Sequence, residues 1–259
     1  MEIREVAPEE LDYVAMLCVD PGISPKMREA MQPAMEVRKE WLKTMMRRGL
    51  QVSVALEKSE DVRNKKIREL TIHGNVPTGL IEYVPIELAP EPVKGTSSLF
   101  INCLWVLPPF WHVGLGQALL ERVVEKARRY GGASVLAYER DKWFSYSFDY
   151  MPMSFFKKFG FEEVCRDRSR VLLHLNLGAD EMPTLISPKT RKIKKCDRMV
   201  VDVFFSSQCP WSGWMLDKVK QKMKKFNAVV NAISTDDRKV VEKYGISRGV
   251  SINGAPVIK

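Results

Sequence analysis

The stretch "FWHVGLGQALLE" (110–121) carries the residues with the clearest chemical use. An apolar, strand-like segment leads into helical periodicity, with Gly114 and Gly116 at the junction. The first turn of a helix has backbone N–H groups without intrahelical partners and a positive dipole end, and glycines allow an anion to approach that backbone closely. The pattern therefore predicts an anion-binding turn, with a plain strand-to-helix corner as the alternative.

A second reactive group is the thiol of Cys209 in "VDVFFSSQCPWSGWMLDKV" (201–219). It directly follows a predicted strand and begins a predicted helix, whose N-terminus favours the thiolate form. The alternative is a structural cysteine. The five cysteines of the chain form no CxxC pair and no zinc spacing, and their odd number argues against a disulfide framework. We therefore expect no metal site and a reducing, cytoplasmic setting.

The composition is that of a globular protein with a core, because 45% of the 259 residues are hydrophobic and 28% are charged. The length favours two domains. No apolar run reaches the ~18 residues of a membrane span, and the N-terminus lacks an apolar signal region. The net charge of +9 favours polyanions, but the basic run "SPKTRKIKKCDR" (187–198) is typical of a solvated linker, so nucleic acid is not the expected partner.

Periodicity predicts an α/β (α+β) chain with two units. The first contains strands at 2–6, 51–57, 78–86, 98–107, 134–139 and 161–176, and helices at 8–19, 25–48 with a break at Pro33, 114–129 and 152–158. The segment 177–197 has little periodicity and separates the units. The second contains strand 199–205, helix 211–225, strand 227–233, helix 236–244 and a hairpin at Asn253-Gly254, where Pro256 restricts the last strand to an edge.

Two longer stretches resemble the GNAT N-acetyltransferases. "LFINCLWVLPPFWHVGLGQALLERVVEKA" (99–127) is similar to the strand, bulge and glycine turn of that family, and "SFFKKFGFEEV" (154–164) is similar to its following helix and strand. The resemblance covers residues 1–176 and implies a mixed central sheet flanked by helices, with acetyl-CoA as cosubstrate. By position, it implies a splayed strand that holds the pantetheine and a backbone cradle for the pyrophosphate. The strand residues are Leu104, Trp105 and Val106, and the cradle residues are His112, Val113, Gly114, Leu115, Gly116 and Gln117.

The family mechanism implied is direct attack of an amine on the thioester, with a general base and a general acid. Trp111 stands where the family usually has Arg or Gln, and Phe156 replaces its usual acid tyrosine. Tyr150, in the aromatic insertion "ERDKWFSYSFDYMPM" (139–153), becomes the candidate acid, with Tyr146 beside it. The candidate bases are Glu82 and Glu139. The insertion itself either forms the wall of an acceptor pocket or covers one end of the sheet.

The second unit resembles a short thioredoxin-like domain of βαβαββ order, with a Cys-Pro-Trp-Ser turn in which Ser212 replaces the second cysteine. Exchange at Cys209 would then need Cys196 or a low-molecular-weight thiol as the resolving group. Arg248 stands near the position of that family's cis-proline, and we expect it to stabilise the Cys209 thiolate.

The whole order resembles the YoaP-like acetyltransferases: a GNAT domain (1–176), a basic linker (177–197) and a thioredoxin-like domain (198–259). It predicts an N-acetyltransferase acting on the amine of a small molecule. The alternatives are a non-catalytic acyl-CoA-binding or thiol-responsive protein with a reactive Cys209, and a thiol-disulfide protein with a scaffold domain.

Overall fold

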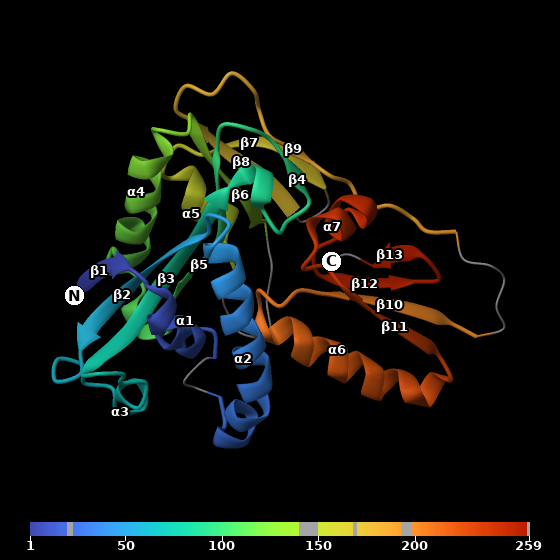
Figure 1. The fold of residues 1–259 in the computed structure, drawn as a ribbon, viewed down its shortest axis with the longest axis horizontal. Coiled ribbons are helices and arrows are strands. Elements are labelled where there is room, and N and C mark those ends of the chain that lie inside the picture. Colours follow the sequence, from blue (N-terminus) through green and yellow to red (C-terminus); the bar gives the residue numbers. More distant parts are fainter. Residues whose placement is uncertain (20–22, 140–149, 168–169, 193–197, 258–259) are drawn as a thin grey trace.

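Two β-sheets organise the chain (Figure 1), in a computed structural model that describes all residues except 20–22, 140–149, 168–169, 193–197 and 258–259. The larger sheet belongs to the N-terminal lobe (1–186) and has the strand order β1-β2-β3-β5-β6-β8-β7. Its strands are β1 (Glu2–Glu5), β2 (Gln51–Lys58), β3 (Asn75–Pro85), β5 (Leu99–Val106), β6 (Gly132–Tyr138), β7 (Glu162–Asp167) and β8 (Arg170–Asn176). The helices of this lobe are α1 (Leu11–Leu17), α2 (Pro25–Met46), α3 (Lys65–Arg68), α4 (Leu115–Ala127) and α5 (Met153–Lys157).

The larger sheet is mixed, as predicted, because β5 and β6 run parallel while the other neighbouring strands are antiparallel. The β5–β6 pairing runs from Leu99↔Ala133 to Ile101↔Val135 and stops there. Beyond that point β5 pairs with β3 and β6 pairs with β8, while Tyr138 at the end of β6 also bridges to Pro152. A bulge lies at the same place, since Ile101 pairs with Tyr83 but Cys103 pairs with Glu82, which leaves Asn102 without a partner in β3. The two central strands therefore separate just after Ile101.

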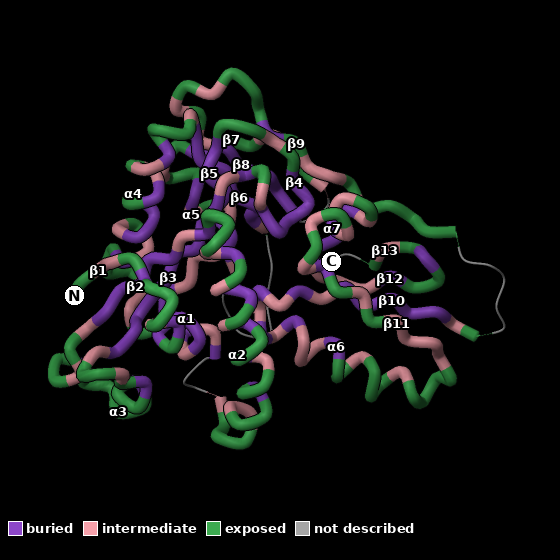
Figure 2. The backbone as a smooth tube through the Cα atoms, viewed as in Figure 1, coloured by how far each residue is buried: buried purple, intermediate pink, exposed green. Residues whose placement is uncertain are grey.

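Helices cover both faces of this sheet. Successive strand residues point to opposite faces: Val135 packs in the core beneath α4 and α5, whereas Leu136 packs in the core beneath α1 and α2. The amphipathic α4 buries Leu119, Leu120 and Val123 completely against the sheet. Figure 2 shows these buried segments along the central strands.

Two predictions about elements were wrong. Helix α2 continues through Pro33, although proline removes one backbone hydrogen bond and costs about 3 kcal/mol in a helix interior. Met31 and Met35, on either side, are buried in a cluster with Trp211 and Trp214, and this packing offsets the cost. The predicted single strand 161–176 is instead the antiparallel pair β7 and β8. The polar residues between Cys165 and Val171 interrupt the apolar pattern, which favours a turn over a continuous buried strand.

The C-terminal lobe (199–257) contains a sheet of strand order β11-β10-β12-β13. Its elements are β10 (Val200–Phe205), α6 (Pro210–Met223), β11 (Val229–Ser234), α7 (Arg238–Tyr244), β12 (Gly249–Ile252) and β13 (Ala255–Val257), in the predicted βαβαββ order. The hairpin prediction is confirmed: Asn253 (φ 49°) and Gly254 (φ 81°) form the turn, and Pro256 lies on the edge strand β13. A further pair, β4 (Val93–Lys94) and β9 (Thr184–Leu185), joins the segment before the basic run to the N-terminal lobe.

The two lobes meet along a polar and aromatic seam. The indole Nε1 of Trp211 donates to the carbonyl of Cys18 at 2.7 Å, and α6 packs against α2. The guanidinium of Arg238 donates to the carbonyls of Ala89 and of Val93, the latter at 2.8 Å. These contacts hold the start of α6 and the start of α7 against the N-terminal lobe. No helix in the described part of the chain is long and apolar enough to cross a membrane.

Candidate active site

The turn before α4 is open at its backbone. Gly114 is the N-cap residue, with φ 85°, and His112 also has a positive φ of 62°. A Cβ added at Gly114 would meet nothing within 4 Å, and Val113 is 68% exposed. The first N–H groups of a helix lack intrahelical acceptors. The turn thus presents unhindered donors and the positive end of α4 to an anion.

Two side chains that begin α4, those of Leu115 and Gln117, already have partners within the protein. Leu115 is 1% exposed and packs in the core, while the Gln117 amide donates to Glu121 at 2.8 Å. A Cβ at Gly116 would only touch the Phe155 ring at 3.5 Å, which is an ordinary contact. The backbone, rather than any of these side chains, is therefore the available binding surface.

The separated edge of β5 carries an N–H group with a weak partner. The amide of Leu104 donates to the thioether sulfur of Met151 at 3.1 Å, and a thioether is a poor acceptor. At the end of the strand, the indole of Trp111 donates to the Val106 carbonyl at 2.6 Å and meets the Trp105 ring edge-on at 6.5 Å. A carbonyl oxygen placed beside Leu104 would be a better acceptor than the sulfur that it replaced.

The two candidate bases have opposite environments. Glu82 is fully buried and forms an ion pair with the buried Arg38. Among the described residues, Glu82 Oε2 and Arg38 Nε have no hydrogen-bond partner. Glu139 is 52% exposed and receives a 2.7 Å hydrogen bond from Arg166. Only Glu82 lies next to the point where the central strands separate, because it pairs with Cys103 across β3 and β5.

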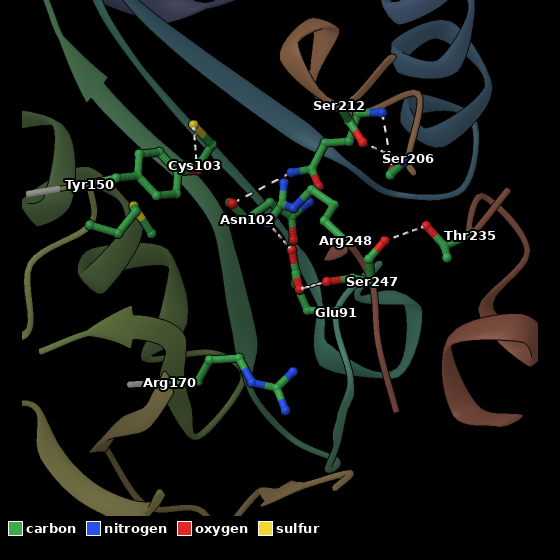
Figure 3. Close-up of polar contacts among 12 residues, drawn as sticks. Glu91, Asn102, Cys103, Tyr150, Arg170, Ser206, Ser212, Thr235, Ser247 and Arg248 are labelled. Atoms are coloured by element: carbon green, nitrogen blue, oxygen red, sulfur yellow. Dashed lines mark hydrogen bonds and ion pairs between the residues drawn. The ribbon is translucent and has the colours of Figure 1, made fainter. Parts of the chain in front are cut away.

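Tyr150 faces the same place from the end of the insertion. Its hydroxyl donates to the Cys103 sulfur at 3.5 Å (Figure 3). Its ring lies 6.1 Å from the ring of Tyr138. Burial raises the pKa of Tyr150 well above its usual value, so the phenol keeps its proton at neutral pH. Tyr146 and residues 140–149 of the insertion lie outside the described residues.

Three thiols gather at the seam. Cys209 is half-buried at the N-cap of α6. Its neighbour Gln208 donates to the Asn102 carbonyl at 3.4 Å, and Trp211 reaches Cys18. Burial raises the pKa of the Cys18 thiol to about 12 and also raises the pKa of the Cys103 thiol. Ser212 does not point outward, because its hydroxyl accepts the Ser206 N–H at 3.0 Å. Cys196 lies outside the described residues.

Arg248 reaches across the seam to the N-terminal lobe. Its guanidinium forms an ion pair with Glu91, and the second carboxylate oxygen of Glu91 accepts the Ser247 hydroxyl. Arg248 also lines a small cavity with Tyr150 and Asn102. The structure thus brings together Tyr150, Glu82, Cys209 and Arg248 from distant parts of the chain. Over the described residues, no group of His, Cys, Asp and Glu side chains is arranged to hold a metal ion.

Sequence reasoning missed Asn102, Arg38 and Glu91. The sequence contained a signal for Asn102, because it is the single amide in the otherwise apolar strand "LFINCLWV" (99–106). Glu82 stands out in the same way among the apolar residues around it in β3. Arg38 and Glu91 gave no such signal. Their environment depends on packing against residues far along the chain.

The sequence model of the acetyltransferase (GNAT) family matches residues 37–161. The chain is 24% identical over 216 residues to the uncharacterized N-acetyltransferase YoaP of Bacillus subtilis (strain 168). The matched region covers 81% of this chain and 75% of that protein.

Solved structures of acetyltransferases are similar to about two thirds of this chain. One is the PaiA N-acetyltransferase from Thermoplasma acidophilum in complex with coenzyme A, with 14% identity, a TM-score of 0.44 and coverage of 68% of this chain and 98% of that chain. Another is a GNAT acetyltransferase from Brucella melitensis in complex with acetyl-CoA, with 15% identity, a TM-score of 0.40 and coverage of 70% and 90%. These two structures contain coenzyme A and acetyl-CoA, respectively. In this chain, the open turn before α4 has the free backbone donors that can bind an anion.

Proposed function

We propose that the protein transfers an acetyl group from acetyl-CoA to the amine of a small molecule by direct attack in a ternary complex. The observation that carries this proposal is the separation of β5 and β6 after Ile101. The open turn of α4 lies at one end of the freed β5 edge, and the cavity beside Tyr150 lies at the other. A cosubstrate that lies along Leu104, Trp105 and Val106 would bring its thioester to that cavity.

The residues then have the following roles. The N–H of Leu104 would bind the thioester oxygen as it becomes negatively charged during attack by the amine. The amine proton passes to a carboxylate, for which the buried position beside Cys103 supports Glu82 over the exposed Glu139. As the carbon–sulfur bond breaks, the departing thiolate of coenzyme A takes the proton of the Tyr150 hydroxyl.

The Gly114→Asp variant tests the cosubstrate site. It places a negative charge and a strained side chain at φ 85° in the turn, so we expect acetyl-CoA binding to fall by at least ~100-fold. Isothermal calorimetry on the wild type and the variant measures the change, and Gly178→Asp, at another exposed glycine of positive φ, is the control. Equal acetyl-CoA affinity in wild type and Gly114→Asp would contradict the assignment of the turn.

The second candidate function is thiol chemistry at Cys209. Cys209 lies at the seam, because its neighbours Gln208 and Trp211 donate hydrogen bonds to the carbonyls of Asn102 and Cys18 in the N-terminal lobe, and this position favours the candidate. Because the raised pKa values of Cys18 and Cys103 leave little thiolate, we expect N-ethylmaleimide at pH 8 to modify both at least ~100-fold more slowly in the native protein than in urea. We expect Cys209 to react first. Peptide mass spectrometry resolves the sites, with Cys209→Ser as the control. Modification of Cys18 ahead of Cys209 would reject this candidate.

We further propose that residues 198–259 form a thioredoxin-like domain, that 177–197 is a linker and that 1–176 is the acetyltransferase domain. The strand order β11-β10-β12-β13 and the place of Cys209 at the start of α6 support the thioredoxin-like domain. Free cysteines among the described residues support a cytoplasmic protein. They also support a low-molecular-weight thiol as a second partner.

A further inference from the structure

Met151 occupies the gap between the two central strands. Its thioether sulfur accepts the N–H of Leu104 on β5 at 3.1 Å, and its carbonyl accepts the N–H of Tyr138 on β6 at 3.1 Å. Leu104 and Tyr138 each lie three residues past the last paired residues of β5 and β6. Met151 therefore joins the separated strands, with its backbone on β6 and the end of its side chain on β5.

The backbone of Met151 is fixed in this position. Its φ of 48° lies in the left-handed region, which residues with a side chain rarely adopt, and the next residue, Pro152, bridges to Tyr138. Met151 is 4% exposed and packs in the core cluster that contains Phe156. An unfavourable backbone conformation persists where the surrounding structure imposes it. The thioether, by contrast, can move, because methionine is unbranched and has three rotatable side-chain bonds.

The space beside the Met151 side chain is small. A cavity of about 10 Å³ adjoins it at the point where the strands separate, and Ile101, Leu136 and Tyr138 line this cavity together with Met151. A cavity needs roughly 10–15 Å³ to hold one water molecule. A chain that extended past Met151 would therefore find room for no more than a water-sized group.

We propose that Met151 determines the length of the acyl group that the protein accepts, admitting acetyl and excluding longer chains. This inference rests on the proposed acetyl transfer, in which the thioester oxygen takes the Leu104 N–H from the Met151 sulfur. An acetyl group is about as large as the end of the methionine side chain that must give way to it. Because Met151 lies between that N–H and the cavity, each further methylene would meet its side chain or the cavity wall.

Truncation of Met151 tests this role. One methylene in an apolar site changes kcat/KM by about 10- to 200-fold, so we expect the wild type to use acetyl-CoA at least ~100-fold better than butyryl-CoA with one small-amine acceptor. Met151→Ala should weaken this preference at least ~10-fold, because the space left by the side chain joins the cavity. Thiol release measures kcat/KM, and isothermal calorimetry without acceptor measures the affinities for the two CoA esters.

Three further variants separate the size of the side chain from other effects. Met151→Gly also removes the side chain but suits a φ of 48°, so it keeps the test valid if Met151→Ala does not fold. Met151→Leu removes the sulfur at nearly constant volume and should retain the wild-type preference. Met182→Ala is the control for a methionine outside the site, since Met182 is 49% exposed.

The outcomes distinguish this inference from the proposed function. Acetyl transfer to small amines, with the same preference for acetyl-CoA in the wild type and in both truncated variants, would overturn the inference and leave the proposed function standing. A calorimetric preference for acetyl-CoA that the truncations weaken, without transfer to any amine, would support the role of Met151 and reject the transfer. Equal use of the two CoA esters by the wild type, or loss of the preference in Met151→Leu, would also overturn the inference.

Discussion

Replacing Tyr150 with phenylalanine is expected to lower kcat by about 10²- to 10⁴-fold, the usual contribution of a general acid. The ring would still pack against Tyr138, so only the hydroxyl beside Cys103 is lost. Because burial raises the pKa of Tyr150, the wild-type rate should not fall between pH 8 and 10 through ionisation of this phenol. Thiol release from acetyl-CoA, followed at saturating acceptor from pH 6 to 10, measures both effects.

Tyr130→Phe is the matched control for this change, since Tyr130 is 41% exposed in the turn that follows α4. Its rate should equal that of the wild type. Calorimetry on Tyr150→Phe should give the wild-type affinity for acetyl-CoA, because the proposed cradle lies in the turn before α4. A decrease in kcat of less than ~3-fold in Tyr150→Phe would show that another group protonates the thiolate, and that the phenol only packs.

Arg38→Met is expected to destabilise the protein by about 3–5 kcal/mol, the usual effect of breaking a buried ion pair from one side. Arg38 is 2% exposed and its partner Glu82 is fully buried, so the variant leaves a carboxylate without its cation between α2 and β3. Urea unfolding followed by tryptophan fluorescence measures the free energy of unfolding. Glu82→Gln should destabilise by a similar amount, since it leaves the guanidinium alone.

The double variant Arg38→Met/Glu82→Gln identifies the cause. With both charges absent, we expect it to be more stable than either single variant, with a coupling energy above ~1 kcal/mol. Glu36→Gln, on the exposed face of α2, serves as the control and should change stability by less than ~0.5 kcal/mol. Additive single effects would mean that the pair is not coupled and that the losses come from packing alone.

Local patterns predicted most elements of the fold. The amphipathic α4, the strands β2, β3, β5 and β6, and the Asn253-Gly254 hairpin each follow from periodicity or turn chemistry within a few residues. The same local logic failed at Pro33, where packing of α2 against Trp211 and Trp214 outweighs a proline, and between β7 and β8. The first failure arose from a tertiary contact, which single-residue preferences do not include. The second arose from a turn signal whose strength was underestimated.

The candidate site was less predictable because its groups come from distant segments. The open backbone at the start of α4 is a local property, so the positions of Gly114 and Gly116 in the sequence were enough to predict it. By contrast, Arg38 lies 44 residues from Glu82, and Glu91 lies 157 residues from Arg248. No spacing rule connects such pairs. The orphaned amide of Asn102 depends on a one-residue bulge, which a strand pattern does not reveal.

The contacts at the seam also predict how the N-terminal lobe would behave if it were produced without the C-terminal lobe. Without α6 and the segment around Arg248, the surface near Asn102, Cys18 and Glu91 would become solvent-facing, and the carboxylate would lose its cation. With acetyl-CoA bound along β5 as proposed above, water could then enter the space beside its thioester and compete with the acceptor as a nucleophile. The C-terminal half would thus act as a barrier to hydrolysis, and the shortened enzyme would be a leaky thioesterase rather than a smaller transferase.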